Sequence, residues 1–370
     1  MKILFIINSM SFGGAEKQAL DLLIGLKNRG IQIHLVTLIM PTAFIHELKI
    51  NKINYSCINL TQKNKKNILS HYSAFLNLYH IVKKFQPEII HSHLFHSNMY
   101  GRVVSLFLKT KNISTIHSLI ENGNFRPILY RYTDWLCSKT VFVSDVSRLK
   151  YLKNKSVKEG KCYTINNGFD LSRKNIKDST DISSLRQKHS FGVDNFIWIS
   201  IGRLISTKGY LLLLESFLLL YNANDRARLV IVGDGEDKEM INCFIVNNAL
   251  EKIVILLSPT PDIDQVYLLA DAYISTSKVE SFGMTLVEAI MFNLPIVSTM
   301  NGGAEELLLN KNIGLLTADR RPSSIVQLMV ETMNEKTKNS PDSYRNLLNL
   351  YDIEKIVERW IDLYLKTLRT

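Results

Sequence analysis

Short runs of β-branched and aliphatic residues alternate with longer helical patterns along the whole of this 370-residue chain. The first half has six such runs: Ile3–Ile7, Ile33–Leu38, Glu88–His91, Ile113–Ile116, Thr140–Val143 and Cys162–Ile165. The second half has six more: Phe196–Ile201, Arg228–Val232, Ile253–Leu257, Ala272–Ser275, Ile296–Ser298 and Gly314–Leu316. Neighbouring parallel strands need a long crossover, which is usually a helix. The alternation therefore predicts an α/β fold built on parallel sheets.

The length of the chain is enough for about two domains, each with its own core. Residues 172–194 are polar, charged and only weakly periodic, and we expect the interdomain linker there. The N-terminal domain would then span residues 1–171 and the C-terminal domain residues 195–351. In the final segment, 352–370, apolar residues recur with helical spacing from Ile353 to Leu368, which predicts an amphipathic helix.

The composition is that of an ordinary globular protein, with 46% hydrophobic and 21% charged residues. The four cysteines, Cys57, Cys137, Cys162 and Cys243, form no C-x-x-C pair, which favours reduced thiols in the cytoplasm and argues against structural zinc. The apolar stretch that follows Lys2 is too short for a signal peptide, and we expect a buried first strand instead. The longest apolar run, Leu211–Tyr221, is interrupted by Glu215 and is too short to span a membrane.

Positive charge is concentrated in the first half. Residues 1–170 hold 23 Lys and Arg against 9 Asp and Glu, a net charge of +14, whereas residues 171–370 have a net charge of −3. The cations cluster at Lys63–Lys66, at Lys83 and Lys84, and from Arg148 to Lys161, and the first two clusters flank an amphipathic pattern over Ile68–Phe85. That pattern fits either a core-facing helix with a solvated basic face or a surface that rests on an anionic membrane. No nucleic-acid recognition motif accompanies the charge.

Two features of the first half lie where a strand gives way to a helix. Gly13 and Gly14 follow the first strand, and a glycine pair at this point lets a ligand approach the backbone. His117 ends the strand Ile113–Ile116, at the edge where open α/β sheets bind ligands, although a structural hydrogen bond would explain it equally well. His91, His93 and His96 have no carboxylate near them in the sequence, which argues against a metal site.

The first strand of the second half ends in Gly202, and Arg203 and Lys208 follow it just before a Leu-rich helix. Two cations beside a helix N-terminus suit a diphosphate, and a solvated loop is the alternative. Asp262 and Asp264 have the spacing of a metal-binding D-x-D motif. Because a helical pattern begins directly after them, we expect one of them to be an N-cap instead.

Glu280 and Glu288 stand on either side of Gly283 and the start of a predicted helix over Leu286–Phe292. The unpaired amides at a helix start carry partial positive charge, so the backbone of Phe282–Thr285 could hold a phosphate. A carboxylate beside it could accept two hydrogen bonds from a ribose diol. The alternative for Glu288 is a capping box with Thr285.

Taken in order, these motifs resemble the family-4 retaining glycosyltransferases of the GT-B fold, of the type that builds bacterial surface polysaccharides. The resemblance rests on Gly13-Gly14, on Gly202-Arg203 with Lys208-Gly209, on Gly233-Asp234-Gly235, on the two glutamates and on Asn301–Glu306. Ser281 and the segment Ser258–Pro261 replace glycines that are usual in the family, which leaves the sugar and the base open.

The resemblance implies two Rossmann-like domains that face each other across a cleft, with the helix in 352–370 packing back on the first domain. It implies that the second domain binds a nucleoside-diphosphate sugar, with Glu288 on the ribose, Glu280 on the sugar, and Arg203 and Lys208 on the diphosphate. The other donor-binding residues that it implies are Gly14, Gly233, Phe282, Gly283, Met284 and Thr285. It also implies that His117 contacts the transferred sugar, so the expected catalytic residues are His117, Arg203, Lys208 and Glu280.

Cations that stabilise the leaving diphosphate make a divalent metal unnecessary, so we expect no metal and no other cofactor. The expected function is retaining transfer of a sugar to a glycan or lipid-linked acceptor, in O-antigen, capsule or another surface polysaccharide. A GT-B nucleotide-sugar epimerase is the alternative, and a nucleic-acid-binding protein is a third, less favoured one. We expect a cytoplasmic protein that is peripheral on the inner face of the plasma membrane and has no nucleic-acid partner.

Overall fold

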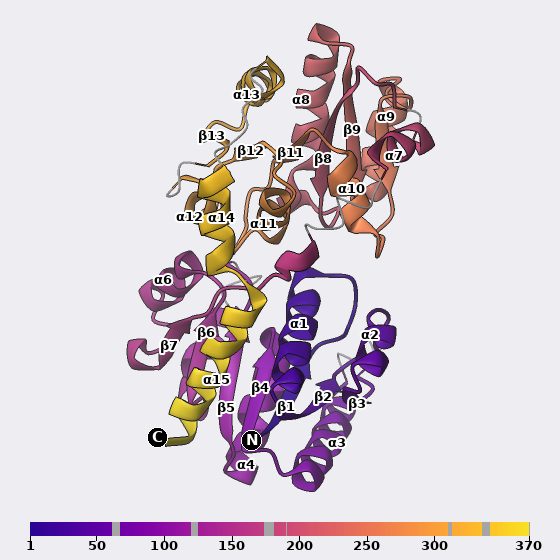
Figure 1. Cartoon of the computed structure of the whole chain (residues 1–370). Coiled ribbons are helices and arrows are strands. Elements are labelled where there is room, and N and C mark those ends of the chain that lie inside the picture. The colour runs from indigo at the N-terminus through magenta and orange to yellow at the C-terminus, as the bar shows by residue number, and fades with distance from the viewer. Residues whose placement is uncertain are drawn as a thin grey trace. The chain divides into compact units, whose positions relative to one another are not determined.

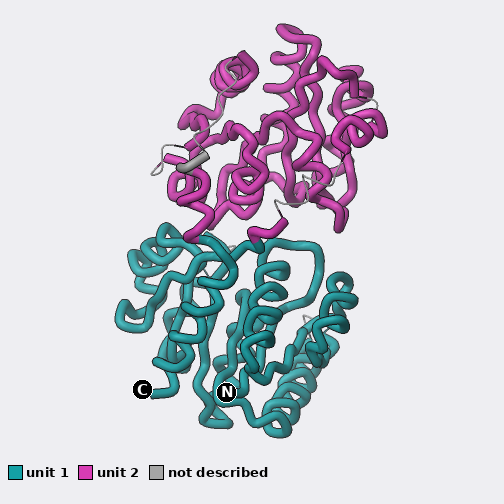
Figure 2. The backbone as a smooth tube through the Cα atoms, in the orientation of Figure 1, with its two compact units in different colours: residues 1–170, 351–370 teal, residues 171–350 magenta. Residues whose placement is uncertain are grey.

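The computed structural model describes residues 1–60, 67–119, 125–173, 181–189, 191–309, 313–334 and 341–369. They form two compact units, coloured separately in Figure 2. Unit 1 comprises residues 1–170 and 351–370, and unit 2 comprises residues 171–350. Each unit contains one parallel sheet with helices packed on it (Figure 1).

The sheet of unit 1 has seven strands in the order β3-β2-β1-β4-β5-β6-β7, and every neighbouring pair is parallel. Its strands are β1 (Lys2–Ile7), β2 (Gln32–Thr37), β3 (Asn54–Cys57), β4 (Ile89–His93), β5 (Lys111–Ile116), β6 (Lys139–Phe142) and β7 (Cys162–Thr164). Its α-helices are α1 (Gly14–Asn28), α2 (Ile45–Ile50), α3 (Ile68–Phe85), α4 (Phe95–Leu108), α5 (Phe125–Thr133), α6 (Asp145–Lys153) and α15 (Ile353–Arg369). Unit 1 also contains the 3-10 helices η2 (Asp134–Leu136), between α5 and β6, and η3 (Glu159–Lys161), between α6 and β7.

Strand β1 shows why this sheet is covered on both faces. From Ile3 to Ile7 its residues are all apolar and buried, and successive side chains point to opposite faces. Phe5 packs into a core with α1 and α15, whereas Leu4 packs into a second core with α3 and α4. In the first of these cores Gly25 of α1 faces Val357 of α15, so the two helices approach closely.

The sheet of unit 2 has six parallel strands in the order β10-β9-β8-β11-β12-β13. Its strands are β8 (Phe196–Ile201), β9 (Ala227–Val232), β10 (Val254–Leu257), β11 (Ala272–Ser275), β12 (Ile296–Thr299) and β13 (Leu315–Thr317). Its α-helices are α7 (Ile182–Lys188), α8 (Tyr210–Ala223), α9 (Lys238–Asn247), α10 (Ile263–Leu269), α11 (Met284–Met291), α12 (Gly302–Leu307), α13 (Pro322–Asn334) and α14 (Pro341–Leu350). The 3-10 helix η5 (Ser206–Lys208) lies between β8 and α8.

The strand order of each sheet locates its ligand-binding edge. In unit 2 the chain proceeds outward from β8 to β10 and then returns to place β11 on the other side of β8. Open α/β sheets bind ligands at such a switch point, outside the carboxyl ends of the strands. In unit 1 the corresponding point lies between β1 and β4. The loops after β8 and β11 carry Arg203 and Glu280, and the loop after β1 ends at Gly13, directly before Gly14 begins α1.

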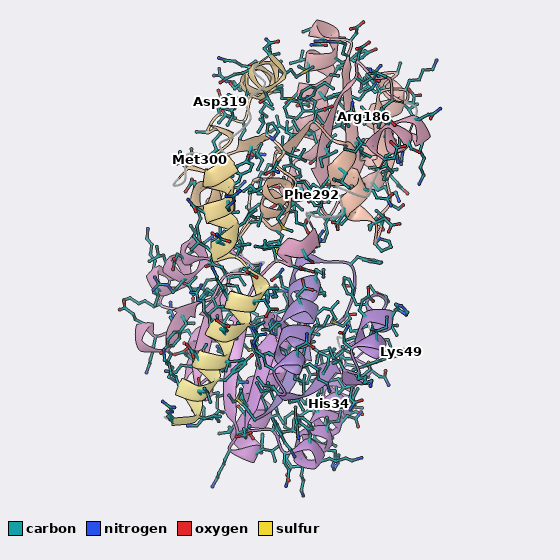
Figure 3. All side chains as sticks on the ribbon, in the orientation of Figure 1. His34, Lys49, Arg186, Phe292, Met300 and Asp319 are labelled. Atoms are coloured by element: carbon teal, nitrogen blue, oxygen red, sulfur yellow. The ribbon has the colours of Figure 1, made fainter. Side chains whose placement is uncertain are left out.

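The parallel-sheet α/β organisation predicted from the sequence is confirmed, and β8 and β11 have the predicted bounds. The sequence did not indicate strand β3, which is short and carries the polar residues Asn54 and Ser56. The expected linker, 172–194, contains helix α7. Asp181 caps this helix, and Arg186 (labelled in Figure 3) binds Asp271 at the start of β11. Within the described ranges, no helix has both the length and the apolarity needed to cross a bilayer.

Candidate active site

Lys208 and Glu280 meet at the switch point of unit 2. Lys208 ends η5, directly after β8, and its Nζ forms an ion pair with the Glu280 carboxylate. Ser277, three residues before Glu280 in the loop after β11, donates a hydrogen bond to the same carboxylate at 3.1 Å. Both charged side chains are mostly buried, with exposed fractions of 20% and 16%. Burial makes this pair stronger than a surface salt bridge and costly to separate.

The backbone around this pair is fixed by a buried network. Thr276 donates from its hydroxyl to the carbonyl oxygen of Gly209 at 2.9 Å, which ties the loop after β11 to the end of η5. Arg320 donates to the carbonyl oxygens of Thr276 and Ser277 from the other side. The two loops that carry Lys208 and Glu280 are therefore held in register before any ligand binds.

Arg203 is exposed, and its side chain has no hydrogen bond or ion pair among the residues that the structure describes. Its backbone leaves β8 at Gly202, whose amide donates to the carbonyl oxygen of Val232 at the end of β9. The structure thus places both predicted cations at the carboxyl edge of the sheet, but Lys208 alone is engaged by a carboxylate in the described residues.

Gly233 follows β9 and lies against the loop after β8. A Cβ atom at this position would collide with the carbonyl oxygen of Gly202. The close approach of two strand ends therefore requires glycine here. Gly233 supports the shape of the edge that carries Arg203.

Helix α11 begins between the two glutamates. Its N-cap is Gly283, which has a φ of 85°, a left-handed conformation that favours glycine. Phe282 is buried in front of it, and Thr285 accepts a hydrogen bond from the hydroxyl of Tyr273 at 2.6 Å. The helix start that Phe282, Gly283, Met284 and Thr285 form is thus present as predicted, two residues earlier than the predicted helix.

Glu288 is not part of a capping box, so that alternative is wrong. Because Gly283 is the N-cap, Thr285 lies inside the helix, and its hydroxyl is engaged by Tyr273. The Glu288 carboxylate is instead held by Arg173, with Nη1 to Oε1 at 3.2 Å, and by the hydroxyl of Tyr267, which donates to Oε2 at 2.8 Å. Its carboxylate therefore belongs to a charged cluster with Arg173 and Asp264.

The two aspartates of the D-x-D sequence have different surroundings. Asp262 occupies the N-cap position of α10, as expected for one of them, but its side chain makes no capping hydrogen bond. Asp264 pairs with Arg173, which also contacts Glu288. Among the described residues, no group of three or more His, Cys, Asp or Glu side chains is arranged to hold a metal ion.

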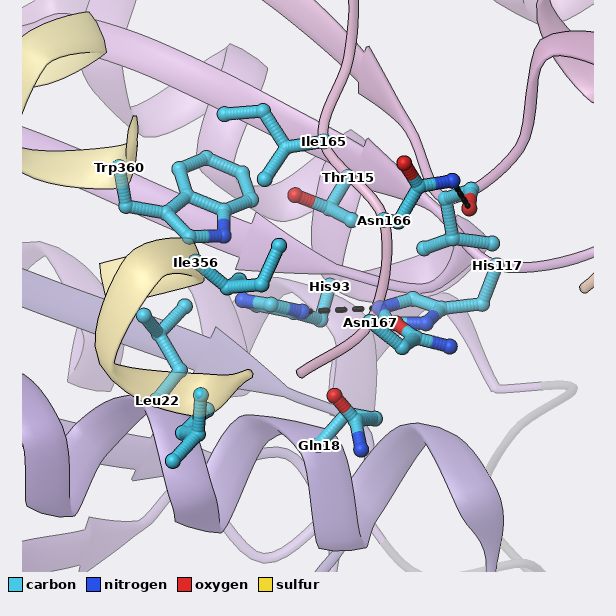
Figure 4. Close-up of a pocket in the computed structure, with 12 residues that line it drawn as sticks. Gln18, Leu22, His93, Thr115, His117, Ile165, Asn166, Asn167, Ile356 and Trp360 are labelled. Atoms are coloured by element: carbon cyan, nitrogen blue, oxygen red, sulfur yellow. Dashed lines mark hydrogen bonds between the residues drawn. The ribbon is translucent and has the colours of Figure 1, made fainter. Parts of the chain in front are cut away.

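Three histidines of unit 1, His91, His93 and His117, form a row at the carboxyl ends of β4 and β5, in which His91 and His93 are fully buried and His117 is partly buried. His91 bonds to Thr115 and to Tyr364 of α15, each at 2.7 Å, and its ring centroid lies 4.3 Å from that of His93. Nδ1 of His93 lies 2.9 Å from Nε2 of His117, which follows β5 as predicted. Figure 4 shows this bond in a small pocket, with Gln18 of α1 below it and Trp360 of α15 beside His93.

Burial keeps these rings uncharged. It lowers the pKa of His117 to about 4, and it lowers the pKa of His91 and of His93 well below the usual value, with a further lowering by neighbouring histidines. Neutral imidazoles act as single donors and single acceptors. This row is therefore a hydrogen-bonding element at neutral pH.

Gly14 is the first residue of α1, with Gly13 as its extended N-cap. The N-terminus of this 15-residue helix lies at the carboxyl end of β1, beside the switch point of unit 1. The glycine pair thus lies at the junction of a strand and a helix, and the approach of a ligand to its backbone stays a prediction.

Sequence reasoning missed Arg173, Tyr267 and Ser277. Arg173 lies in the polar segment interpreted as a linker, and Tyr267 lies within an apolar helical pattern, so neither carried a local signal. Ser277 stands three residues before Glu280 at a strand end, and this spacing could have indicated its role.

Two family models match the chain. Residues 12–173 match the family model described as Glycosyltransferase Family 4, and residues 181–346 match the one described as Glycosyl transferases group 1. The chain is 24% identical over 312 residues to the phosphatidylinositol N-acetylglucosaminyltransferase GPI3 subunit of Saccharomyces cerevisiae (strain YJM789), with 79% of this chain and 66% of that protein covered. It therefore spans just under two thirds of the length of this relative.

A second relative is the UDP-Gal:alpha-D-GlcNAc-diphosphoundecaprenol alpha-1,3-galactosyltransferase of Escherichia coli, 24% identical over 315 residues that cover 81% of this chain and 80% of the relative. Among solved structures, Anabaena Alr3699/HepE in complex with UDP-glucose has a TM-score of 0.84 at 22% identity, with 100% and 99% of the two chains covered. At that identity the likeness concerns the fold. Because the two family models together account for nearly all of residues 12–346, the chain belongs to the family-4 glycosyltransferases of the GT-B type.

Proposed function

We propose that this glycosyltransferase moves a sugar, with retention of configuration, from a nucleoside-diphosphate sugar to a glycan or lipid-linked acceptor of a surface polysaccharide. The observation that carries the proposal is the buried Lys208–Glu280 pair at the switch point of unit 2, beside the start of α11. A cation, a carboxylate and a helix N-terminus at one sheet edge suit a ligand that has both an anionic diphosphate and a hydroxyl-rich sugar.

Cleavage of the glycosyl–phosphate bond moves negative charge onto the departing diphosphate. Lys208, Arg203 and the amides at the start of α11 would stabilise that charge, in a site where Lys208 is already mostly buried. These groups supply fixed positive charge, so we propose that the reaction proceeds without a divalent metal.

Within the same proposal Glu280 binds the sugar hydroxyls and Glu288 binds the ribose. Gly233, Phe282, Gly283, Met284 and Thr285 shape the donor site. His117 and Gly14 belong to unit 1, and we assign them to the transferred sugar and to the phosphate on the basis of the family resemblance. The neutral His117 can donate or accept one hydrogen bond at its free nitrogen, which suits a sugar hydroxyl.

A lipid-linked acceptor is supported by the two relatives, whose names state a phosphatidylinositol and a diphosphoundecaprenol substrate. We therefore propose a peripheral location on the cytoplasmic face of the membrane. The predicted basic run Lys63–Lys66 lies outside the described residues. Helix α3 buries Ala74, Leu78 and Val82 against the sheet. Most of this helix is therefore a core-facing helix with a solvated basic face, the first of the two alternatives for Ile68–Phe85, and not a membrane-facing surface.

Helix α5 offers a better membrane-facing surface than α3. Its exposed apolar side chains, together with Trp135 of η2, recur at helical spacing, at Phe125, Ile128, Tyr132 and Trp135. Residues 125–161 hold nine Lys and Arg against three Asp and Glu, a net charge of +6. Exposed aromatic residues beside cations are typical of helices that lie in a membrane interface.

The test of the proposed donor site is Glu288→Ala. We expect this variant to keep its fold and to bind nucleotide sugars more weakly, as measured by calorimetric titration. Unchanged donor affinity would contradict the assignment of Glu288 to the ribose.

A further inference from the structure

Glu288 is held in place by two side chains that come from different parts of unit 2. Arg173 precedes α7, and its Nη1 lies 3.2 Å from Oε1 of Glu288. Tyr267 belongs to α10, and its hydroxyl donates to Oε2 at 2.8 Å. Each carboxylate oxygen of Glu288 therefore already has one donor.

Both donors are themselves fixed. Asp264 engages two nitrogens of Arg173, with Nε to Oδ2 at 3.2 Å and a second contact from Nη2 to Oδ1. The ring of Tyr267 is fully buried and stacks on Phe292, with ring centroids 5.1 Å apart and an interplanar angle of 1°. Neither group can follow the carboxylate if it rotates, so the Glu288 rotamer is set by its surroundings.

The Glu288 carboxylate still has acceptor sites for a ligand. A carboxylate offers about two lone-pair sites on each oxygen. One site on each oxygen is used by Arg173 or Tyr267, which leaves one on each oxygen. A vicinal diol has two hydroxyl donors at a matching separation, one for each remaining site.

The charges also fit this task. Asp264 and Glu288 are mostly buried, with exposed fractions of 18% and 14%, and two such carboxylates near one cation would repel each other if the cation were removed. Burial lowers the pKa of Arg173, but its hydrogen bond to Asp264 and the two negative charges outweigh burial, so the net effect is to raise this pKa. Burial and the Glu288 charge raise the pKa of Tyr267 well above the usual value, so its hydroxyl remains a donor.

We propose that Arg173 and Tyr267 are positioning residues that aim the Glu288 carboxylate at a ribose diol, and that Asp264 holds Arg173 in place for this task. The proposal rests on the proposed function, because it takes a ribonucleotide as the ligand of Glu288. It explains why the second aspartate of the D-x-D sequence pairs with an arginine. It also gives a role to Arg173, which lies in a segment without a recognisable motif.

The same contacts have a competing interpretation. Arg173 could instead occupy the place of the diol, so that the nucleotide must displace it. The two interpretations predict opposite changes in ribonucleotide affinity when Arg173 is removed. If Arg173 positions Glu288, its loss weakens ribonucleotide binding, and if Arg173 blocks Glu288, its loss strengthens binding.

The experiment compares a ribonucleotide with its 2′-deoxy form. Calorimetry first identifies which of UDP, GDP, ADP and CDP binds the wild-type chain most tightly, and the 2′-deoxy form of that nucleotide is the second probe. We expect wild type to prefer the ribonucleotide by about 10-fold or more, the scale of one hydrogen bond to a charged group. We expect Arg173→Gln and Tyr267→Phe to reduce this preference to about 3-fold or less and to leave the deoxynucleotide affinity nearly unchanged.

Two variants control for a merely structural effect. Tyr344→Phe removes another buried tyrosine hydroxyl in unit 2, which bonds to the carbonyl oxygen of Leu294, and Arg186→Gln removes another partly buried ion pair. Both should keep the full preference. Arg173→Lys keeps the charge but loses the two-nitrogen contact with Asp264, so it provides an intermediate case if Arg173→Gln fails to fold.

The outcomes distinguish the assignment of Glu288 to the ribose from the positioning role of Arg173 and Tyr267. If wild type shows no preference, or if Glu288→Gln keeps it, the ribose assignment itself is wrong. If Glu288→Gln abolishes the preference while Arg173→Gln and Tyr267→Phe retain it, the positioning role is overturned and the ribose assignment stands. Tighter ribonucleotide binding by Arg173→Gln, or an equal loss for both probes, also overturns the positioning role.

Discussion

Nδ1 of His93 lies 2.9 Å from Nε2 of His117, which connects the ends of the neighbouring strands β4 and β5. Nε2 of His93 is buried and has no hydrogen-bond partner among the residues that the structure describes. Because an unpaired buried N–H is rarer than an unpaired acceptor, the favoured arrangement has His93 donating to His117. His117 would then carry its proton on Nδ1 and present a donor to a ligand.

His117→Ala should impair sugar transfer more than binding of the nucleoside diphosphate. The reason is that His117 is assigned to the transferred sugar, whereas the nucleotide contacts are assigned to unit 2. Turnover with a nucleotide sugar and calorimetric affinity for the diphosphate should be measured on the same preparation. Equal losses in the two measurements, or no loss in either, would refute this assignment.

Mild acid should destabilise unit 1. Below the ordinary histidine pKa of about 6.5 the unfolded chain binds protons that the buried rings of His91, His93 and His117 do not. The contribution of these neutral rings to the stability of unit 1 is therefore complete above about pH 6.5. It is lost as the pH falls toward the pKa of His117, which is about 4. The urea midpoint should be lower at pH 5 than at pH 7.5. A midpoint that does not change over this range would mean that the rings are not buried in their neutral form.

Lys208→Ala and Arg203→Ala should each lower turnover by about 10²–10³-fold, the scale for removal of one group that stabilises developing charge. Lys208 is paired with Glu280 in the described structure, so its loss also leaves a mostly buried carboxylate without its cation. Lys238→Ala is the matched control, since Lys238, the first residue of α9, forms an exposed ion pair with Asp234 in the loop before this helix. A Lys238→Ala defect as large as that of Lys208→Ala would show that the effect is not specific to the site.

Trp135 should report membrane binding directly. The chain has three tryptophans; Trp135 is 65% exposed, whereas Trp198 and Trp360 are buried. Vesicles of phosphatidylcholine with phosphatidylglycerol should shift its fluorescence to shorter wavelengths, added salt should reverse the shift, and pure phosphatidylcholine should have little effect.

A pair of substitutions tests which helix is responsible. Ile128→Ser with Tyr132→Ser on α5 should abolish the shift, whereas Ile68→Ser with Tyr72→Ser, the same residue types at exposed positions on α3, should preserve it. The reverse pattern would return the membrane-facing role to α3. Indifference to lipid charge would leave the basic first half unexplained by membranes.

The sequence predicts elements well where one apolar run forms one strand. Phe196–Ile201 is such a run and forms β8 with those bounds, because it is buried on both faces of a parallel sheet. Strand β3 was missed because it lies at the edge of the sheet, where Asn54 and Ser56 replace the usual apolar residues. A strand at a sheet edge needs less apolar sequence than a central one.

The sequence indicated where the candidate site residues lie along the chain, but not which side chains they bind. Glu280 and Lys208 were both assigned from their places after strands, yet nothing in the sequence indicated that they bind each other. The capping box failed because Gly283, with its left-handed backbone, begins α11 before Thr285. Arg173 reaches Glu288 across 115 residues of sequence, and only the fold brings the two together.

The central claim is that the chain transfers a sugar from a nucleoside-diphosphate donor to an acceptor without a metal. The most direct test incubates the chain with a panel of labelled nucleotide sugars and saccharide-diphosphate lipids in excess chelator, and follows the label. We predict label in the lipid product with one donor, loss of that signal in Lys208→Ala, and little free sugar. Release of free sugar and nucleoside diphosphate without an acceptor product, as the epimerase alternative requires, or activity only with added Mg²⁺ or Mn²⁺, would contradict the account.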